Sequence, residues 1–518
     1  MVTLDEIDSL LLQKPSGDAP EEVLERPQSD YKPLDTFKLV KGRSYQQQFA
    51  DTYFLRLTQI KPAVEAVAEA AWEGTVIGGE TAQKVNRVLD VRQGELCWVA
   101  GTIYMDMPMK PNILDDVSKD RWISAPTSVT RYFSDDDRDA VMLEDDSGRL
   151  RLTGTALKSH ICVTGCIAAV MGTENATGDF EVVDIMFPDL PPQPDRWSIA
   201  RSTAPNDSDK GKSGGGGGGG GTKPKAKGED VEMADAPSTS SGNKIAIVSG
   251  LNFSGEDTSY AMELNLLLEY LLGEALDPSA QAEIAHISRL IIAGNSIAAA
   301  NATVTDFTAD KKGISKKYGY DSSSYNALPS QLLDEFLFEL LPTMPVTLLP
   351  GQNDPANASY PQQPIHTAMF PKSREFTALP TAESRGWLDT VTNPWEGEVD
   401  GWRLLGTGGQ NVDDIFKYVE GDQRLDMMEA MCRWRCSAPT APDTLWSYPF
   451  QDDDPFVMKD CPHVYFVGSQ PEFGTRVISG PEGQTVRLIS VPSFSASKEI
   501  VLLDTETLEV SRVKIVTT

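Results

Sequence analysis

Apolar residues between positions 45 and 71 recur at spacings of three and four, which predicts an amphipathic helix. The repeating positions are Tyr45, Phe49, Tyr53, Leu57, Ile60, Val64, Val67 and Ala71. Pro62 interrupts this pattern, so either the helix kinks there or a second helix begins with Pro62 in its first turn. Residues 1–40 are rich in Pro, Asp, Glu and Ser, which predicts a poorly ordered arm with one short helix at Leu4–Leu12.

From about residue 85 the pattern changes to short runs of β-branched and aromatic residues, which are typical of strands. These runs are Leu96–Tyr104, Ala140–Glu144, Leu150–Thr153, Ile161–Met171 and Phe180–Ile185. The tripeptide Asp146-Ser147-Gly148 supplies a tight turn, so Leu143–Gly154 is predicted to form a hairpin. Together the runs predict a small closed or half-closed barrel over residues 85–195, preceded by a helical segment over residues 41–84.

Residues 202–242 predict a flexible linker, because they contain eight consecutive glycines (Gly214–Gly221) and no apolar run that could form a core. A basic cluster at Lys223–Lys227 lies inside this segment. We interpret the cluster as part of a solvated linker, with a weak electrostatic contact or an import signal as the alternatives.

Residues 243–518 alternate short apolar runs with helical patterns, which predicts an α/β layered fold with one mixed sheet or two sheets. The expected strands are Ile245–Val248, Leu290–Ile292, Val346–Leu349, Val464–Val467, Val486–Val491 and Ile500–Leu503. The expected helices are Tyr260–Leu272, Ser330–Leu341 and Val412–Val419, and Asn411 is the expected N-cap of the last one.

Length and charge narrow the functional classes. The chain has 518 residues, which suggests two or three domains, and its formal net charge is −30. Such a surface repels a phosphate backbone, so binding to nucleic acid through the bulk surface is not expected. Six cysteines are too few for a disulfide scaffold and fit a reducing compartment. No membrane span and no secretory signal are expected from the sequence.

Histidine and cysteine offer little for a metal site. The four histidines, none paired with another at ligand spacing, are His160, His286, His366 and His463. Cys162 and Cys166 fall in an expected strand, where residues four apart lie about 13 Å from each other and cannot share an ion. Cys432 and Cys436 have helical spacing, and we interpret them as buried thiols because no second pair stands nearby.

The loops that follow the C-terminal strands are the informative feature, because α/β proteins place ligands at strand ends. They read IVSGLNFSG (Ile247–Gly255), IIAGNSIA (Ile291–Ala298), LLPGQNDPAN (Leu348–Asn357) and VYFVGSQPEFG (Val464–Gly474). The order of these loops and the residues in them resemble the motifs of the calcineurin-like metallophosphoesterases. In that family, acids, amides and imidazoles from these loops hold two metal ions that clamp a phosphate and activate water.

The resemblance implies that the ligands have been lost. The family's motif positions correspond to Gly250 and Asn252 in the first loop, Gly294 and Asn295 in the second, Gly351, Gln352, Asn353 and Asp354 in the third, and Gly468, Ser469 and Pro471 in the last. Glycine and proline carry no side-chain ligand, and neutral amides cannot offset two divalent cations. The resemblance therefore implies a retained scaffold without catalytic residues, metal ligands or a cofactor.

Longer strings extend the resemblance to most of the chain. These include RSYQQQFADTYFLRL (Arg43–Leu57), LEDDSGRLRLTG, VTGCIAAVMG, LPGQNDPANASYPQQPIHTAMFP, LLGTGGQNVDDIFKY, APDTLWSYPF, CPHVYFVGSQPEFGT and VRLISVPSFS. They resemble the DNA polymerase delta/II small subunit family, over about Phe37 to Val513 apart from the linker. The resemblance implies a multi-domain α+β protein in which an OB-fold barrel precedes an inactivated calcineurin-like phosphoesterase α/β sandwich, over residues 85–195 and 243–518.

For function, the resemblance implies a nuclear, non-catalytic scaffold of the polymerase delta holoenzyme in DNA replication and repair. The expected partners are the cysteine-rich C-terminal domain of the catalytic subunit and a third accessory subunit, with the polymerase zeta catalytic subunit as a further partner. DNA would be contacted only indirectly, and no membrane is involved.

Two rival hypotheses are an active metallophosphodiesterase or nuclease, which the missing ligands oppose, and a single-strand binder that uses the barrel. The second needs a basic groove with aromatic platforms. The barrel region offers Trp98, Tyr104, Trp122, Tyr132 and Phe133, but acids surround them.

Overall fold

The computed structural model describes residues 24–40, 42, 49–111, 130–134, 138–196, 243–274, 278–298, 326–379 and 386–516. The expected helix at Leu4–Leu12, the expected linker over 202–242, the start of the helical pattern at Tyr45 and the barrel-region Trp122 lie outside these residues.

An N-terminal barrel is built from one closed sheet. Its strands are β4 (Gln83–Lys84), β5 (Leu96–Asp106), β6 (Ala140–Glu144), β7 (Arg149–Thr153), β8 (Ile167–Glu174) and β9 (Asp179–Met186). They follow the order β4-β5-β6-β7-β9-β8, and an additional antiparallel pairing of β5 with β8 closes the barrel. The expected hairpin is confirmed, because the Asp145 side chain accepts hydrogen bonds from the backbone N–H groups of Ser147 and Gly148 between β6 and β7.

Helix α2 (Ala50–Trp72) covers one side of the barrel and continues through Pro62. Its buried residues Ile60, Val64, Ala68 and Trp72 repeat every four positions and pack against Leu96, Trp98, Ile167 and Ala169 of the barrel. The helix is therefore single over its described length, and no second helix begins at Pro62. A small hairpin of β2 (Val76–Ile77) and β3 (Glu80–Thr81) follows it.

Two six-stranded sheets form the larger part of the molecule. The first has the order β13 (Leu388–Thr390), β12 (Val346–Leu349), β11 (Ile287–Ala293), β10 (Lys244–Val248), β19 (Glu499–Asp504) and β20 (Val510–Lys514). The second has the order β1 (Tyr31–Leu34), β14 (Trp395–Val399), β15 (Trp402–Thr407), β16 (Val464–Gln470), β18 (Thr485–Pro492) and β17 (Gly474–Ser479). Strands β10 to β13 run parallel to one another, as do β15, β16 and β18.

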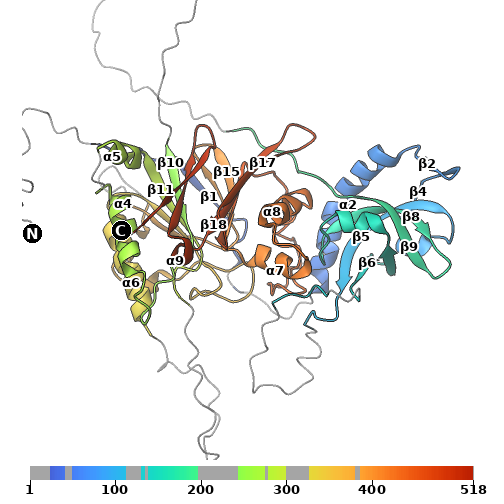
Figure 1. Ribbon diagram of the computed structural model, residues 1–518, viewed down its shortest axis with the longest axis horizontal. Helices are drawn as coiled ribbons and strands as arrows, with labels where there is room; N and C mark the ends of the chain where they lie inside the picture. The colour runs from blue at the N-terminus through green and yellow to red at the C-terminus, as the bar shows by residue number, and fades with distance from the viewer. Residues whose placement is uncertain are drawn as a thin grey trace, which may run out of the picture.

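The sheets stack face to face, with helices outside both. Their shared core includes Ile247, Ile291, Trp395 and Phe466. Helices α4 (Ala261–Leu272), α5 (Pro278–Ala285) and α6 (Leu328–Leu340) lie beyond the first sheet, and α7 (Gln410–Tyr418) and α8 (Arg424–Arg433) separate the second sheet from α2 and the barrel (Figure 1). The remaining short helices are α9 (Phe494–Ser497) and the 3₁₀ turns Val88–Asp90, Thr155–Ser159, Thr367–Met369 and Ser373–Thr377.

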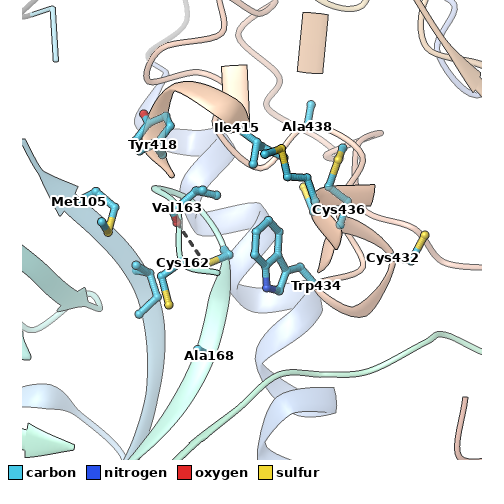
Figure 2. Packing of buried hydrophobic residues seen from close by; sticks show 14 of the residues in the cluster. Met105, Cys162, Val163, Ala168, Ile415, Tyr418, Cys432, Trp434, Cys436 and Ala438 are labelled. Atoms are coloured by element: carbon cyan, nitrogen blue, oxygen red, sulfur yellow. Dashed lines mark hydrogen bonds between the residues drawn. The ribbon is translucent and has the colours of Figure 1, made fainter. Parts of the chain in front are cut away.

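The barrel and the second sheet share one apolar core. Figure 2 shows Trp434 and Cys436, from the segment after α8, beside Cys162 and Val163 of the barrel, and all four side chains are buried. The joint is also polar, because the backbone N–H of Tyr132 donates to the carbonyl oxygen of Lys417 at 2.7 Å. The barrel is therefore packed firmly onto the sheets.

The structure corrects three expectations. Strand β8 begins at Ile167, so Cys162 and Cys166 precede it in a turn and the strand-spacing argument about this pair was wrong, although both thiols are buried. Asn411 is no N-cap: α7 begins at Gln410 after Gly409, and the buried Asn411 amide donates to the Ser437 carbonyl instead. Within the arm expected to be poorly ordered, Tyr31–Leu34 forms β1, which pairs with β14.

Candidate functional site

Loops from both sheets meet at the carboxyl ends of their parallel strands. The backbone N–H of Gly250, after β10, donates to the carbonyl oxygen of Gly294, after β11, at 2.9 Å. Gly294 has φ +83°, and a Cβ there would lie 2.9 Å from the Gly408 Cα and 3.1 Å from the Gly351 Cα. Three loops thus approach so closely that only glycine fits between them. We call the residues 249–252, 294–297, 351–354 and 468–470 the strand-end cluster.

The cluster contains several residues in the left-handed region of backbone space. Asn252, Asn295 and Ser469 have φ values of 48°, 52° and 55°. Asparagine tolerates this region better than most residues with a Cβ, whereas serine is unusual there. The loops therefore turn sharply at the ends of β10, β11 and β16, and the Asn295 and Ser469 side chains meet.

Hydrogen bonds within the cluster engage its amides and hydroxyls. The Asn295 amide donates to the Ser469 hydroxyl at 2.9 Å and accepts from the Asn353 backbone N–H at 3.0 Å. The Ser469 backbone N–H donates to the Ser249 hydroxyl at 2.7 Å, which joins β16 to β10 across the two sheets. Asn252 donates to the Ser495 hydroxyl at 2.6 Å. The polar atoms thus hold the loops together.

Asp354 is the buried carboxylate of the cluster. One of its oxygens accepts from the backbone N–H groups of Gly351 at 2.7 Å and Ser296 at 3.2 Å, and the other accepts from Ile297 at 2.8 Å. Burial raises the pKa of Asp354 to about 6, against the opposite effect of these N–H groups. The carboxylate fastens the loop after β12 to the loop after β11.

Gln352, Asn353, Gly468 and Pro471 lie at the edge of the cluster or contribute backbone only. Gln352 and Pro471 are exposed, as is the side chain of Asn353. Gly468 is buried against the carbonyl oxygen of Ala293 and the hydroxyl of Ser249. The structure therefore brings Gly250, Asn252, Gly294, Asn295, Gly351, Asn353, Asp354, Gly468 and Ser469 together, and leaves Gln352 and Pro471 at the periphery.

A second amide group adjoins the cluster and was not identified from the sequence. The Asn393 amide donates to Gln362 and Gln410 at 2.9 Å each and accepts from the Gly408 backbone N–H at 2.9 Å. Gln362 in turn donates to the carbonyl oxygen of Gly351 at 3.0 Å. The available signal was the Thr-Gly-Gly-Gln string at 407–410, which follows β15 as the other loops follow their strands.

The amides, hydroxyls and Asp354 of the cluster form a hydrogen-bonded seam. Within the described ranges, no three His, Cys, Asp or Glu side chains gather as a metal ion would require. His463 lies at the opposite end of β16, where its Nδ1 accepts from the Arg403 backbone N–H at 3.1 Å and burial lowers its pKa. The Asp354 oxygens face backbone donors, and the amides and hydroxyls bind one another.

The barrel aromatics are mostly inside the molecule. Trp98 and Tyr132 are buried, and Phe133 packs against the shared core. Tyr104 is half-buried, with the Arg149 guanidinium 4.6 Å and the Lys110 amine 4.2 Å from its ring centroid. Within the described part of the barrel, the aromatic residues named above therefore serve as core or lie under cationic side chains.

None of the helices within the described ranges is long and apolar enough to cross a membrane.

Comparisons with known proteins match both halves of the chain. A family model described as "DNA polymerase delta subunit OB-fold domain" matches residues 48–185, and a model for the B-type subunit of DNA polymerases alpha and epsilon matches residues 245–475. A DNA polymerase delta small subunit of Saccharomyces cerevisiae is 35% identical over 94% of this chain and 93% of its own length. The corresponding proteins of Arabidopsis thaliana and Oryza sativa are 34% and 32% identical, each over 94% of this chain and over 96% and 98% of their own lengths.

Proposed function

The chain belongs to the DNA polymerase delta small-subunit family, and from that premise we propose that it is a non-catalytic accessory subunit that bridges two partners in the polymerase delta holoenzyme. The proposed partners are the cysteine-rich C-terminal domain of the catalytic subunit and a third accessory subunit, in the nucleus. The observation that carries the proposal is the similarity to small subunits along nearly the full length of both chains.

Reconstitution tests the bridging role. The full chain is mixed with each proposed partner alone and with both, and the complexes are separated by size-exclusion chromatography. We expect two binary complexes and one ternary complex, in which the partners associate only when this chain is present. Failure of both partners to bind would contradict the proposal. The polymerase zeta catalytic subunit is a third arm, which tests whether the chain also serves that enzyme.

We further propose that the two-sheet unit is a calcineurin-like phosphoesterase scaffold that has lost its chemistry. The strand-end cluster supports this proposal, because its amides and hydroxyls hydrogen-bond to one another and Asp354 accepts backbone N–H groups. A two-metal centre needs carboxylates and imidazoles that converge on ions about 3.5–4 Å apart. In an active phosphodiesterase, these side chains would have to break their hydrogen bonds to one another before they could bind metal ions.

Hydrolysis and metal content test the inactivity. We expect purified full chain to show no manganese-dependent cleavage of a generic phosphodiester or of single-stranded DNA above a mock preparation. Elemental analysis should find no stoichiometric metal. Stoichiometric metal, together with activity that disappears in Asn295→Ala but survives in the exposed Gln352→Ala variant, would overturn the proposal.

Exposed aromatic side chains are the proposed partner contacts. Trp446 is 67% exposed, and Phe49 and Phe54 at the start of α2 are 51% and 53% exposed. A hydrogen bond from Gln451 to Asp51 ties the start of α2 to the segment after Trp446. Exposed aromatic rings are enriched where partners bind.

Substitution of Trp446 tests this assignment. We expect Trp446→Asp to weaken binding of at least one partner by about tenfold or more, because hot-spot rings contribute about 2 kcal/mol or more. The matched control is Met262→Asp on α4, which is 63% exposed and should bind as wild type. Equal binding by both variants would exclude Trp446 as a contact. The single-strand binder hypothesis is tested alongside, since a true binder shows a steep decrease in affinity with salt.

A further inference from the structure

A cavity of about 490 Å³ lies at the amino ends of the strands of the first sheet, opposite the strand-end cluster. Its lining includes Ser288 and Arg289 at the start of β11, Pro345 before β12 and Trp387 before β13. The segment 26–33, which leads into β1, forms another wall. The volume falls in the range of pockets that bind small molecules, about 300–1,000 Å³.

Arg289 is a buried cation beside this cavity. Arg289 is only 2% exposed, and its guanidinium carbon lies 3.8 Å from the Tyr31 ring centroid. Nε donates to the Ser29 hydroxyl at 3.3 Å and Nη1 donates to the Thr347 hydroxyl at 2.9 Å, which leaves Nη2 as the remaining donor atom.

No carboxylate of the described residues forms an ion pair with Arg289. Asp389 and Asp400 lie near enough to favour its charge without contacting the guanidinium, and the Asp389 carboxylate accepts a hydrogen bond from the Tyr31 hydroxyl at 2.5 Å. Burial outweighs these acids and lowers the pKa of Arg289 to about 10, so the guanidinium stays charged at neutral pH. Buried charges in proteins are ordinarily paired, and this one has a cavity where a partner would stand.

The surroundings indicate which kind of anion fits. Pro27, Pro33, Pro345, Leu379 and Trp387 make much of the lining apolar. Arg26 adds a second guanidinium, but it donates to the carbonyl oxygens of Ile284, Ile287 and Leu271. Asp30 also lines the cavity, so a ligand with the single charge of a carboxylate meets less repulsion there than a dianion would. A phosphate dianion would leave its second charge unpaired among apolar groups, which is costly.

We propose that this cavity binds a carboxylate carried on an apolar body, with the carboxylate at Arg289 and the body against Trp387 and the prolines. Two sources offer this chemistry: an acidic side chain flanked by apolar residues in a polypeptide, and a small organic acid. Leu379, which is 72% exposed, stands at the edge of the cavity where such a ligand enters.

Calorimetric titration of the full chain tests the proposal with matched probes. Benzoate is compared with benzamide, and acetyl-Leu-Glu-Leu-amide is compared with its Gln counterpart. Each acid and its amide have nearly the same shape, so the difference reports the charge. We expect the acid of at least one pair to bind about tenfold more tightly than its amide. Preference for the peptide identifies a polypeptide as the source, and preference for benzoate identifies a small acid.

Two variants locate the binding. Arg289→Met should abolish the preference for acid over amide, with circular dichroism as the check on folding. Leu379→Glu leaves the buried core untouched and should weaken acid binding about threefold or more by repulsion, while Leu379→Lys should not weaken it. Equal binding of acids and amides, absence of binding by every probe, or unchanged acid binding in Leu379→Glu would each overturn the proposal.

Discussion

Asp354 shows at the scale of single residues how a carboxylate can hold loops together. Its two oxygens accept three backbone N–H groups from two different loops, and the side chain is buried. In Asp354→Asn, one acceptor becomes an NH₂ group that faces these donors. We expect the free energy of unfolding at pH 7 to fall by about 2 kcal/mol. Urea unfolding measures this, and the exposed Asp146→Asn is the control, with an expected change within about 0.5 kcal/mol.

The pH dependence of stability in the wild type and in Asp354→Asn is a separate prediction. The pKa of Asp354 is raised to about 6 in the folded state, above the ordinary value of 3.8. The folded state therefore holds this proton more tightly than the unfolded state, and the resulting stability is lost as pH rises through about 6. Between pH 7 and pH 5 the wild type should gain about 1 kcal/mol that Asp354→Asn lacks. A gap between the two proteins that narrows toward pH 5 would contradict this assignment.

Single residues also show where sequence reasoning was sufficient. The glycines and asparagines after β10 and β11 were identified from the motif positions of the family that the loops resemble, and the structure brings them together. Asn411 was misassigned, because its type suits a helix cap and nothing local reveals that Ser437 binds it instead. Asn393 and Gln362 were missed because their partners are distant in sequence, and only the folded chain makes them neighbours.

Helix α2 depends on a buried ion pair that joins elements far apart in the chain. The Arg56 Nε lies 2.8 Å from an Asp454 oxygen, and both side chains are fully buried. Arg56 also donates to the carbonyl oxygen of Pro439 at 2.6 Å. We expect Arg56→Met to lower the free energy of unfolding by about 3 kcal/mol or more, because Asp454 is then buried without a partner.

A double-mutant cycle separates the pair from the rest of the packing. Asp454→Asn removes the second charge, so Arg56→Met/Asp454→Asn should be more stable than the sum of the two single changes predicts. Denaturant unfolding of the four proteins gives the coupling energy. If the single changes simply add, the ion pair contributes no specific stabilisation, and α2 is held by its apolar face and its other hydrogen bonds.

At the scale of elements, the hydrophobic pattern predicted which segments form strands. It predicted less well where those strands end and which strands pair with them. The expected strand at Val346–Leu349 matches β12, because all four of its residues are buried and read as one apolar run. The edge strands β1 and β20 were missed since they are short, largely polar or exposed, and gain their order from pairing with β14 and β19. Helix α8 was missed for a similar reason: its buried residues are three methionines and Cys432, which stand among charged residues.

The whole molecule brings together the two ends of the segment that the structure leaves undescribed between residues 196 and 243. The Arg196 guanidinium donates to the carbonyl oxygen of Thr505 at 3.2 Å, and the backbone N–H of Thr505 donates to the carbonyl oxygen of Asn243 at 2.8 Å. A short connection can therefore span the same points. The entropic cost of closing a loop rises by only about 0.6 kcal/mol for each doubling of its length.

Replacement of residues 202–242 by a short Gly/Ser connection is expected to leave folding and assembly unchanged. The melting temperature should stay within about 2 °C of wild type, and both partners should still bind. Differential scanning calorimetry and the reconstitution described above measure the two properties. A matched replacement of residues 441–450, which are ordered and include buried Ala441, should destabilise the protein. A large loss of stability or of partner binding on linker replacement would show that the segment has a role of its own.

The six buried cysteines make the protein well suited to distance measurements by site-selective labelling. All six thiols are free and shielded from solvent, and burial raises the pKa of Cys162 to about 12 and of Cys97 to about 11. Maleimide dyes react with exposed thiolates, so the native chain should stay unlabelled while a cysteine introduced at the exposed Met262 reacts at once. A fluorophore there, paired with one on a partner chain, would report how the assembly is arranged without removal of any native cysteine.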